Sequence, residues 1–490
     1  MKNTILIALA LVVLTLPATR ALSFCGFYVA KADATIFNNK SEVILVRDGN
    51  HTVITMSNDF KGEVRDFAMV VPVPVVLREG DIRVVDRRVF DALDAYSAPR
   101  LVEYYDSNPC QQMYVEEMNR NMFAPSVKSL DMLCCDDASV AKEYGVTVEA
   151  QYTVGEYDIL LLSAKESTGL KDWLIMNGYK IPATADEVLQ PYIKSNMKFF
   201  VVKVNLNTMQ NTGYNYLRPI QISFDHERFM LPIRLGMANS QGSQDLIVYA
   251  FTRTGRVECT NYRTIKLPTD KNIPLFVQAK FGEFYKDLFQ KTWRNEGGNG
   301  VFLEYAWNVS PYTPVKCDPC VGNPPYNRDF VDAGISWLDP QNSNPSIFFT
   351  RMHVRYNRSK FPSDLQFQVT PNTETYQCRY ILTHPAGGPF DCDEGQAYIE
   401  DLTRRRKLEV DELAALTGWN NDQGNQYIAE YSHFMKKQNA SNPAKRQEGP
   451  LVLPKLNLWG GVAGGLVIVV SLLLLWWSGS AFSSKKWFHR

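Results

Sequence analysis

The sequence has no excess of charge and lacks the common motifs of hydrolases. It holds 52 basic and 52 acidic residues, so no net field indicates a nucleic acid or an anionic surface as partner. It contains neither a GxSxG nucleophile elbow nor an HExxH zinc pair, which excludes the best-known serine and zinc hydrolase patterns. The six histidines are scattered. We therefore expect no cofactor, and catalysis by a familiar motif is not indicated.

One weaker hydrolase pattern is present in the middle of the chain. Ser195 and Lys198 have the SxxK spacing, but that motif works on a helix, where the lysine lies one turn from the serine. Here the motif runs directly into FFVVKV, which is typical of a strand. The spacing therefore indicates a loop before a strand, and a peptidase would need an active site that the sequence does not reveal.

The chain begins with a short apolar run from Ile5 to Leu16, which follows one lysine and precedes small residues. This layout is typical of a secretory signal peptide, and the run is too short for a stable membrane anchor. We expect residues 1–23 to be the signal, with cleavage after Ala21 or Ser23. The bulk of the chain would then be exported.

A second apolar run lies near the other end, over residues 458–477, and carries no charge. At about 1.5 Å per residue it covers the roughly 30 Å core of a bilayer. The basic residues of the tail, 478–490, favour a cytoplasmic position, and residues 441–457 read as a polar stalk. The sequence predicts a single-pass protein with its N-terminal part exported.

Four glycines in this run form two overlapping GxxxG pairs: Gly460, Gly461, Gly464 and Gly465. Such pairs let two membrane helices approach closely. Glycine is also common near the ends of membrane helices, so the pattern leaves two interpretations: association with a partner helix or a second copy, and simple composition.

The exported part alternates strand and helix patterns, which predicts an α+β fold with largely antiparallel sheets and interspersed helices. Hairpins are expected around Asp48-Gly49-Asn50 and near Gly155, and a helix that Pro99 interrupts is expected over DRRVFDALDAYSAPRLVEYYD. The expected regions are a core over 24–270, with possible lobes at 24–138 and 139–270; a helix, a Cys-Asp-Pro-Cys loop and a small β region over 271–390; and a helical segment over 391–440.

Two polar stretches near residue 400 have plain interpretations. DCDEG, residues 391–395, could supply oxygen ligands for calcium, but it also suits a helix start with Asp393 as cap and Glu394 in the first turn. We favour the helix start. RRRK, residues 404–407, is expected to be the solvated side of a helix.

Nine cysteines in an exported chain should mostly form disulfides where an oxidising pathway exists. Spacing favours Cys110 with Cys134 or Cys135, because adjacent cysteines rarely bond each other. It also favours Cys378 with Cys392. The complete set of disulfide candidates is Cys110, Cys134, Cys135, Cys317, Cys320, Cys378 and Cys392.

Cys317 and Cys320 form a CxxC that could be a redox dithiol, half of a metal site or a disulfide clip. A redox dithiol needs a helix that starts at the first cysteine, and Pro324 and Pro325 prevent one. A disulfide clip is therefore favoured. A zinc site would need two further ligands, which would have to converge from His353, His384 or Cys378.

Several long stretches of the exported part occur in a recognisable order. They are FCGFYVAKADATIFNNKSEVILVRDGNHTVITMSNDF, PRLVEYYDSNPC, ILLLSAKESTGLKDWLIMNGYKIP, LPIRLGMANSQGSQDLIVYAFT, RVECTNYRT, CDPC and FFTRMHVRYN. Together they resemble the bacterial domain-of-unknown-function family 2330, over roughly residues 24 to 385. The resemblance implies a secreted or membrane-anchored bacterial protein, and it supplies no catalytic residues. With the predicted span, it leads us to expect a position in the bacterial inner membrane, with the N-terminal part in the periplasm or outside the cell.

These observations favour a membrane-anchored bacterial envelope protein that binds or scaffolds another envelope protein or a glycan without catalysis. They leave two alternatives. One is a thiol-redox or metal-binding envelope protein centred on Cys317 and Cys320, and the other is a hydrolase with an unrecognised active site. The expected partners are the membrane and another protein or a second copy of the chain, and not a nucleic acid.

Overall fold

The structure is a computed structural model. It describes residues 27–29, 37–38, 41–57, 60–61, 68–111, 145–177, 179, 185–205, 207–209, 216–238, 242–311, 323–338, 345–419 and 423–429. All of these fall in one compact unit, Met1–Met435. Within this part of the chain no helix is long and apolar enough to cross a bilayer. The expected signal peptide, the stalk and the span at 458–477 lie outside the described residues.

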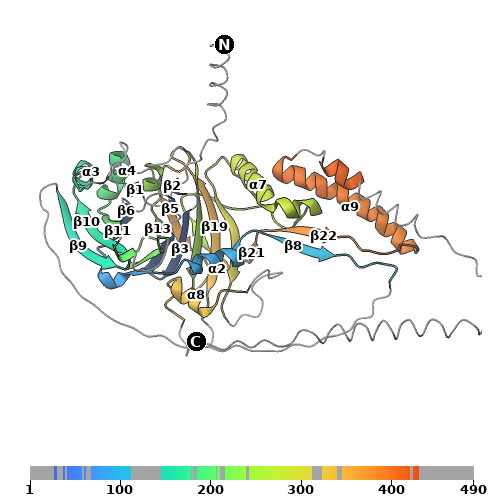
Figure 1. The fold of residues 1–490 in the computed structure, drawn as a ribbon, viewed down its shortest axis with the longest axis horizontal. Helices are drawn as coiled ribbons and strands as arrows, with labels where there is room; N and C mark the ends of the chain where they lie inside the picture. Colours follow the sequence, from blue (N-terminus) through green and yellow to red (C-terminus); the bar gives the residue numbers. More distant parts are fainter. Residues whose placement is uncertain are drawn as a thin grey trace, which may run out of the picture. The chain divides into compact units, whose positions relative to one another are not determined.

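A nine-stranded, mainly antiparallel sheet forms the centre (Figure 1). Its strand order is β16-β18-β19-β14-β3-β4-β12-β7, and β21 pairs with β18. The strands are β3 (Ser41–Asp48), β4 (His51–Ser57), β7 (Ile82–Val84), β12 (Ile220–Asp225), β14 (Gln244–Thr252), β16 (Thr264–Lys266), β18 (Val301–Asn308), β19 (Phe348–Tyr356) and β21 (Tyr376–Gln377). Because β19 pairs with both β14 and β18, one sheet runs across the boundary expected at residue 270.

A five-stranded antiparallel sheet packs against the first. Its order is β1-β6-β11-β10-β9, with β1 (Phe27–Val29), β6 (Ala68–Val73), β9 (Val146–Val154), β10 (Tyr157–Ala164) and β11 (Lys198–Val204). The two sheets share one hydrophobic cluster, in which Leu45 and Met56 of the large sheet join Ile159 and Phe200 of the smaller one. The β9–β10 hairpin turns at Gly155, whose φ of 58° suits glycine. This confirms the hairpin predicted near Gly155.

Helices cover the outer faces of both sheets. α3 (Ser167–Met176) and α4 (Ala185–Lys194) cover the five-stranded sheet, and α2 (Arg88–Ser97) and α8 (Asn327–Asp332) cover the large sheet. Ser195 follows α4 and Lys198 begins β11, which confirms the loop expected for the SxxK spacing. The buried residues of α2 include the four expected from the helical pattern: Val89, Phe90, Leu93 and Tyr96.

The helix expected over residues 86–106 is only partly correct. α2 ends at Ser97, because the residue before Pro99 is forced out of the helical conformation. The following residues form a strand, β8 (Arg100–Tyr105), with a parallel partner in β22 (Arg379–His384). β17 (Lys271–Asn272) pairs with the other side of β22, also in parallel.

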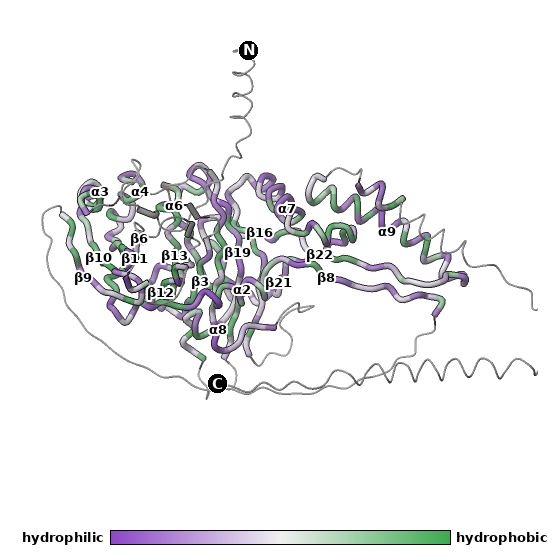
Figure 2. The backbone as a smooth tube through the Cα atoms, in the orientation of Figure 1, coloured by the Kyte–Doolittle hydropathy of each residue, from purple (hydrophilic) through white to green (hydrophobic). Residues whose placement is uncertain are grey.

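Two strands and a long helix lie beside one another at one end of the unit (Figure 1). We call β8, β22 and α9 (Asp393–Thr417) the arm and the two packed sheets with their helices the body. α7 (Phe281–Asn295), preceded by η3 (Leu275–Lys280), lies between body and arm. Apolar and polar residues interchange along α9 (Figure 2). The remaining elements are β13 (Met230–Leu231), β15 (Val257–Cys259) and β20 (Leu365–Val369) in one sheet, β2 (Phe37–Asn38) with β5 (Phe60–Lys61), α6 (Arg234–Ala238) and η2 (Glu79–Asp81).

Candidate functional site

Charged side chains gather on the helix-covered face of the large sheet. Alternate residues of a strand share one face, so Arg351, His353 and Arg355 of β19 point the same way. Their cross-strand neighbours in β14 include Tyr249, opposite Arg351, and Asp245, opposite Arg355. The alternation in FFTRMHVRY resembles a half-exposed strand, yet eight of its nine residues are buried and Arg355 is partly buried.

Glu304 lies at the centre of this network and is 1% exposed. It occupies an irregularity of β18, where the register with β19 shifts between Leu303 and Tyr305. One carboxylate oxygen accepts from Arg351 Nε at 2.6 Å, and the other lies 3.0 Å from His353 Nδ1. Burial raises the pKa of Glu304, but Arg351 and His353 outweigh it and lower that pKa to about 2.

The network continues on both sides of Glu304. Arg351 Nη1 lies 2.7 Å from Asp94 Oδ1 on α2. His353 Nε2 lies 3.1 Å from Asp245 Oδ1, and Arg355 holds both oxygens of Asp245 at 2.7 and 2.9 Å. Burial lowers the pKa of His353, yet the hydrogen bonds to the two carboxylates outweigh it, so that pKa is raised. The imidazole therefore serves as a cationic link between two carboxylates.

The chemistry open to this network is limited by its enclosure. An acid–base residue must reach a substrate, whereas Glu304 is engaged by Arg351, His353 and the Tyr285 hydroxyl, and His353 stacks on Phe289 of α7 with ring centroids 3.9 Å apart. Three cavities that described residues line, of 250, 580 and 290 Å³, contain neither side chain. The network thus ties α2 and α7 to the sheet.

A cavity with polar residues in its lining lies beside α8 and has a volume of 290 Å³. His51 Nδ1 is 3.0 Å from Asp225 Oδ1 there, and Ser223 is nearby on the same strand as Asp225. The Ser223 hydroxyl donates to the Asp81 carbonyl at 3.4 Å rather than to His51. Arg83 donates to Gln221 and to Val331 O. The cavity offers donors and acceptors to a small polar group, without a nucleophile bonded to a base.

The possible metal ligands considered for the CxxC do not converge. His353 lies in the body network, His384 lies 2.7 Å from Glu103 in the arm, and Cys378 is fully buried beside the Tyr380 hydroxyl. Burial raises the pKa of the Cys378 thiol to about 12, so it is inert at neutral pH. Among described residues no group of three acidic, His or Cys side chains could hold a metal. Cys317 and Cys320 lie outside the described residues.

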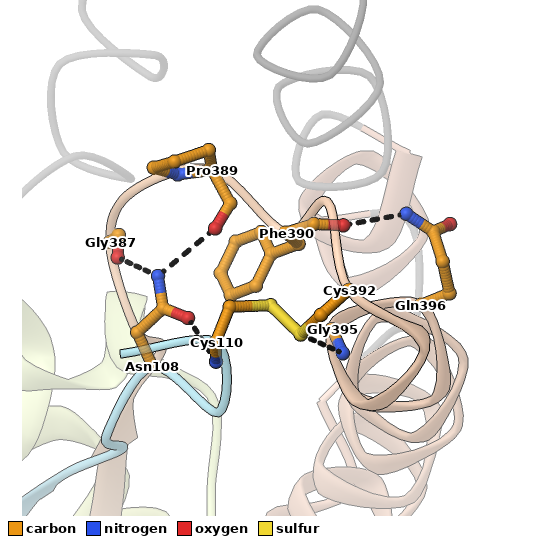
Figure 3. The surroundings of a disulfide bond; sticks show 8 residues. All are labelled: Asn108, Cys110, Gly387, Pro389, Phe390, Cys392, Gly395 and Gln396. Carbon is orange, nitrogen blue, oxygen red and sulfur yellow. Dashed lines mark hydrogen bonds between the residues drawn. A yellow bond between two sulfur atoms is a disulfide. The ribbon is translucent and has the colours of Figure 1, made fainter. Parts of the chain in front are cut away.

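A disulfide joins Cys110, just after β8, to Cys392 at the start of α9 (Figure 3). The expected pairing of Cys378 with Cys392 is wrong, because Cys378 is a buried free thiol, as is Cys259. Cys134 and Cys135, the expected partners of Cys110, lie outside the described residues, but Cys110 is bonded to Cys392, so that pairing is wrong as well. The strand topology explains why Cys110 pairs with Cys392. Because β8 and β22 are parallel, the segments that follow them leave the sheet at the same end.

The loop around the disulfide is fixed by further hydrogen bonds (Figure 3). Asn108 Nδ2 donates to Gly387 O at 3.0 Å and to Pro389 O at 3.2 Å. α9 begins as expected near residue 393, but its cap is Cys392, whose sulfur accepts from Gly395 N. The expected cap, Asp393, instead lies in the first turn with Glu394.

The RRRK stretch of α9 is only partly solvated. Arg404 and Lys407 are exposed, as expected. Arg406 is 1% exposed, with Nη1 2.8 Å from Glu409 Oε2, and its guanidinium lies over the Tyr427 ring at 4.9 Å. Arg405 Nη2 lies 2.6 Å from Asp106 Oδ2, after β8. These contacts fasten α9 to the sheet, a role that a run of like charges does not indicate.

Residues 18–368 match the family described as "Uncharacterized protein conserved in bacteria (DUF2330)". The chain belongs to this family. No curated protein and no solved structure matches the chain. The family region contains β8 but ends within β20, before β22 and α9. The arm therefore combines one strand of the family region with two elements that follow it.

Proposed function

We propose that this DUF2330 protein is a single-pass protein of the bacterial inner membrane whose exported part binds or scaffolds another envelope protein or a glycan without catalysis. The span at 458–477 would anchor it, with the tail in the cytoplasm. The pairs Gly460–Gly464 and Gly461–Gly465 would allow this helix to pack on another copy or a partner helix.

The Cys110–Cys392 disulfide supports export, because such bonds persist in oxidising compartments and are rare in the cytosol. It agrees with the apolar leader at the start of the chain.

The observation that carries the binding role is that the main titratable groups of the body are already engaged by one another. Glu304, His353 and Asp245 are bonded to one another and to arginines inside the body. The arm, by contrast, has exposed tyrosines, Tyr104 and Tyr105. These three groups are engaged by one another and by arginines, while the exposed aromatic surface is suited to contact with a partner.

Proximity labelling from the exported part of the full chain in living cells tests this proposal. We expect envelope proteins to be labelled, and we expect a variant truncated before residue 458 to be released from the membrane. Purified full-length protein that turned over a substrate, with loss of turnover in Glu304→Gln or His51→Asn and an unchanged fold, would overturn the non-catalytic role.

A further inference from the structure

β17, β22 and β8 form a three-stranded sheet in that order, which we call the arm sheet. Its two edges are protected very differently against pairing with another chain. β17 contributes one edge with two residues, and its Lys271 pairs with Glu412 of α9 at 3.2 Å. β8 forms the opposite edge with six residues, RLVEYY. Short edge strands, charged side chains (lysine above all), prolines and bulges are the usual devices against pairing with another chain. β17 is short and has a lysine, whereas β8 has neither proline nor bulge, and Glu103 is its one exposed charge.

The backbone of β8 alternates between its partner and the open side. Arg100 N donates to Cys378 O at 3.2 Å, and Asp106 N donates to His384 O at 2.9 Å. In a parallel pair every second residue directs its N–H and C=O to the same neighbour. Val102 and Tyr104 therefore also face β22. The residues whose backbone groups face the other way are Leu101, Glu103 and Tyr105, and no described backbone group bonds to them there.

The side chains at the β8 edge form an acidic and aromatic surface whose members contact one another. Tyr104 is 45% exposed and Tyr105 is 72% exposed. The Tyr105 ring stacks on His384 with centroids 4.4 Å apart, and its hydroxyl donates to Glu103 at 3.3 Å. Glu103 and Tyr105 share one face of the strand, and Tyr104 lies on the other. A strand added here would meet an acid and a ring on one face and a second ring on the other.

We propose that the β8 edge binds an extended segment of a partner protein, which adds a fourth strand to the arm sheet. The segment carries basic residues on the face of Glu103 and apolar residues on the face of Tyr104. Main-chain bonds to Leu101, Glu103 and Tyr105 supply affinity, and the side chains supply selectivity. This inference rests on the proposed binding role and names the manner of binding and the chemistry of the partner.

Charge disfavours a second copy of the chain as the added strand. Two β8 strands that paired antiparallel with the register centred on Glu103 would place the two Glu103 side chains directly opposite each other. Like charges directly opposite each other destabilise a strand pair. A basic segment replaces this repulsion with attraction, because the Glu103 side chain is 35% exposed, although Gln278 Nε2 and His384 Nε2 already lie 2.8 and 2.7 Å from its oxygens.

The test uses the full chain in detergent and fluorescent eight-residue peptides with alternating lysine and valine, measured by fluorescence anisotropy. A matched peptide has methyl groups on every second backbone nitrogen, and another has glutamate in place of lysine. We expect the lysine peptide to bind and both matched peptides to bind at least about fivefold more weakly, as expected for losing hydrogen bonds or the charge pair. Equal binding of the methylated peptide, or no binding of the lysine peptide, would overturn the proposal.

Two substitutions at one position isolate the backbone. Tyr105→Ala and Tyr105→Pro both remove the exposed ring, but only proline removes the outward N–H. We expect the proline variant to bind the lysine peptide about fivefold more weakly than the alanine variant, and Glu103→Lys to prefer the glutamate peptide. An intact Cys110–Cys392 bond on non-reducing gels and an unchanged Tm verify folding of each variant. Equal binding by the alanine and proline variants contradicts strand addition.

Proximity labelling separates the failure of this inference from failure of the proposed function. If envelope partners are labelled equally by the wild-type chain and by Tyr105→Pro, the edge is not the binding surface and the binding role stands. If the protein turns over a substrate, the non-catalytic role fails, whatever the peptides do.

Discussion

The body and the arm of this molecule are stabilised in different ways. In the body, two sheets share a hydrophobic cluster that spans most of their strands, and a buried ion network crosses one sheet face. One end of the arm, with Tyr380, Leu382 and Leu413, shares that cluster. The end around Phe390 and Leu402 has a small cluster of its own and depends on Cys110–Cys392 and on the Arg405–Asp106 pair. Burial spread over many residues makes the body cooperative, whereas the end of the arm around the disulfide, which few links hold, can open separately from it.

The largest loss of stability is expected from Arg351→Met in the body. The substitution roughly keeps the volume but removes the guanidinium that pairs with the buried carboxylate of Glu304 and the partly exposed carboxylate of Asp94. Breaking a buried pair in this way should lower the free energy of unfolding by about 3 to 5 kcal/mol. Urea denaturation followed by circular dichroism measures the loss.

A matched control is Arg358→Met, at an exposed arginine 3.8 Å from Glu187. An exposed pair contributes about 0 to 1 kcal/mol, so this variant should be nearly as stable as the wild type. A similar loss in both variants would show that the network is no more important than a surface pair.

The next largest effect is expected in the arm, from Cys110→Ser or Cys392→Ser. Loss of the crosslink should destabilise the arm by about 2 kcal/mol, which corresponds to roughly 30-fold faster hydrogen exchange in α9. Exchange in β14 should stay unchanged, because the body does not depend on this bond. Acceleration of both regions together would mean that body and arm unfold as one unit.

A smaller effect is expected when the pH is raised. The pKa of folded His353 lies above its unfolded value of about 6.5. Its imidazolium therefore stabilises the body fully below that pH, and this contribution is lost as the pH rises through the raised pKa. In His353→Asn the stability of the protein should therefore fall less steeply as the pH rises, as measured by urea midpoints between roughly pH 6 and 9. An unaltered slope would exclude His353 as its source.

The acid side of the same comparison belongs to Glu304, whose folded pKa is about 2. Its contribution is complete above the unfolded value of about 4.3 and disappears as the pH falls towards the folded pKa.

The smallest effect concerns thiol reactivity. Cys259 and Cys378 are both buried, and burial raises the pKa of each thiol. Iodoacetamide at neutral pH should leave both unlabelled in the native protein and label both in urea, as peptide mass spectrometry would show. Rapid native labelling of Cys378 would place the junction of body and arm among the mobile regions.

Local patterns predicted local structure well. The spacing of Val89, Phe90, Leu93 and Tyr96 identified α2, because a 3.6-residue period reports directly which side is buried. Asp48-Gly49-Asn50 and Gly155 marked hairpins, because those turns need residues that tolerate a positive φ. Both predictions depend on chain neighbours alone.

Long-range pairing was beyond the reach of the same reasoning. PRLVEYYD continued a helical pattern, and its partner β22 lies more than 270 residues further on. Arg406 is buried because Glu409 and Tyr427 surround it, which a run of basic residues does not reveal. In the candidate site, His353 was considered only as a metal ligand, since nothing local shows that Glu304 and Asp245 flank it.

The position of β8 has a practical consequence for anyone who produces this domain. Sequence similarity suggests a cut at residue 368, yet β8 is within the matched region and its partner β22 follows it. A protein cut there would retain Cys110 as a free thiol and Val102 on a strand without a neighbour. Mixed disulfides and aggregation during expression would follow. The C-terminal end of an expressed domain should therefore be placed after α9.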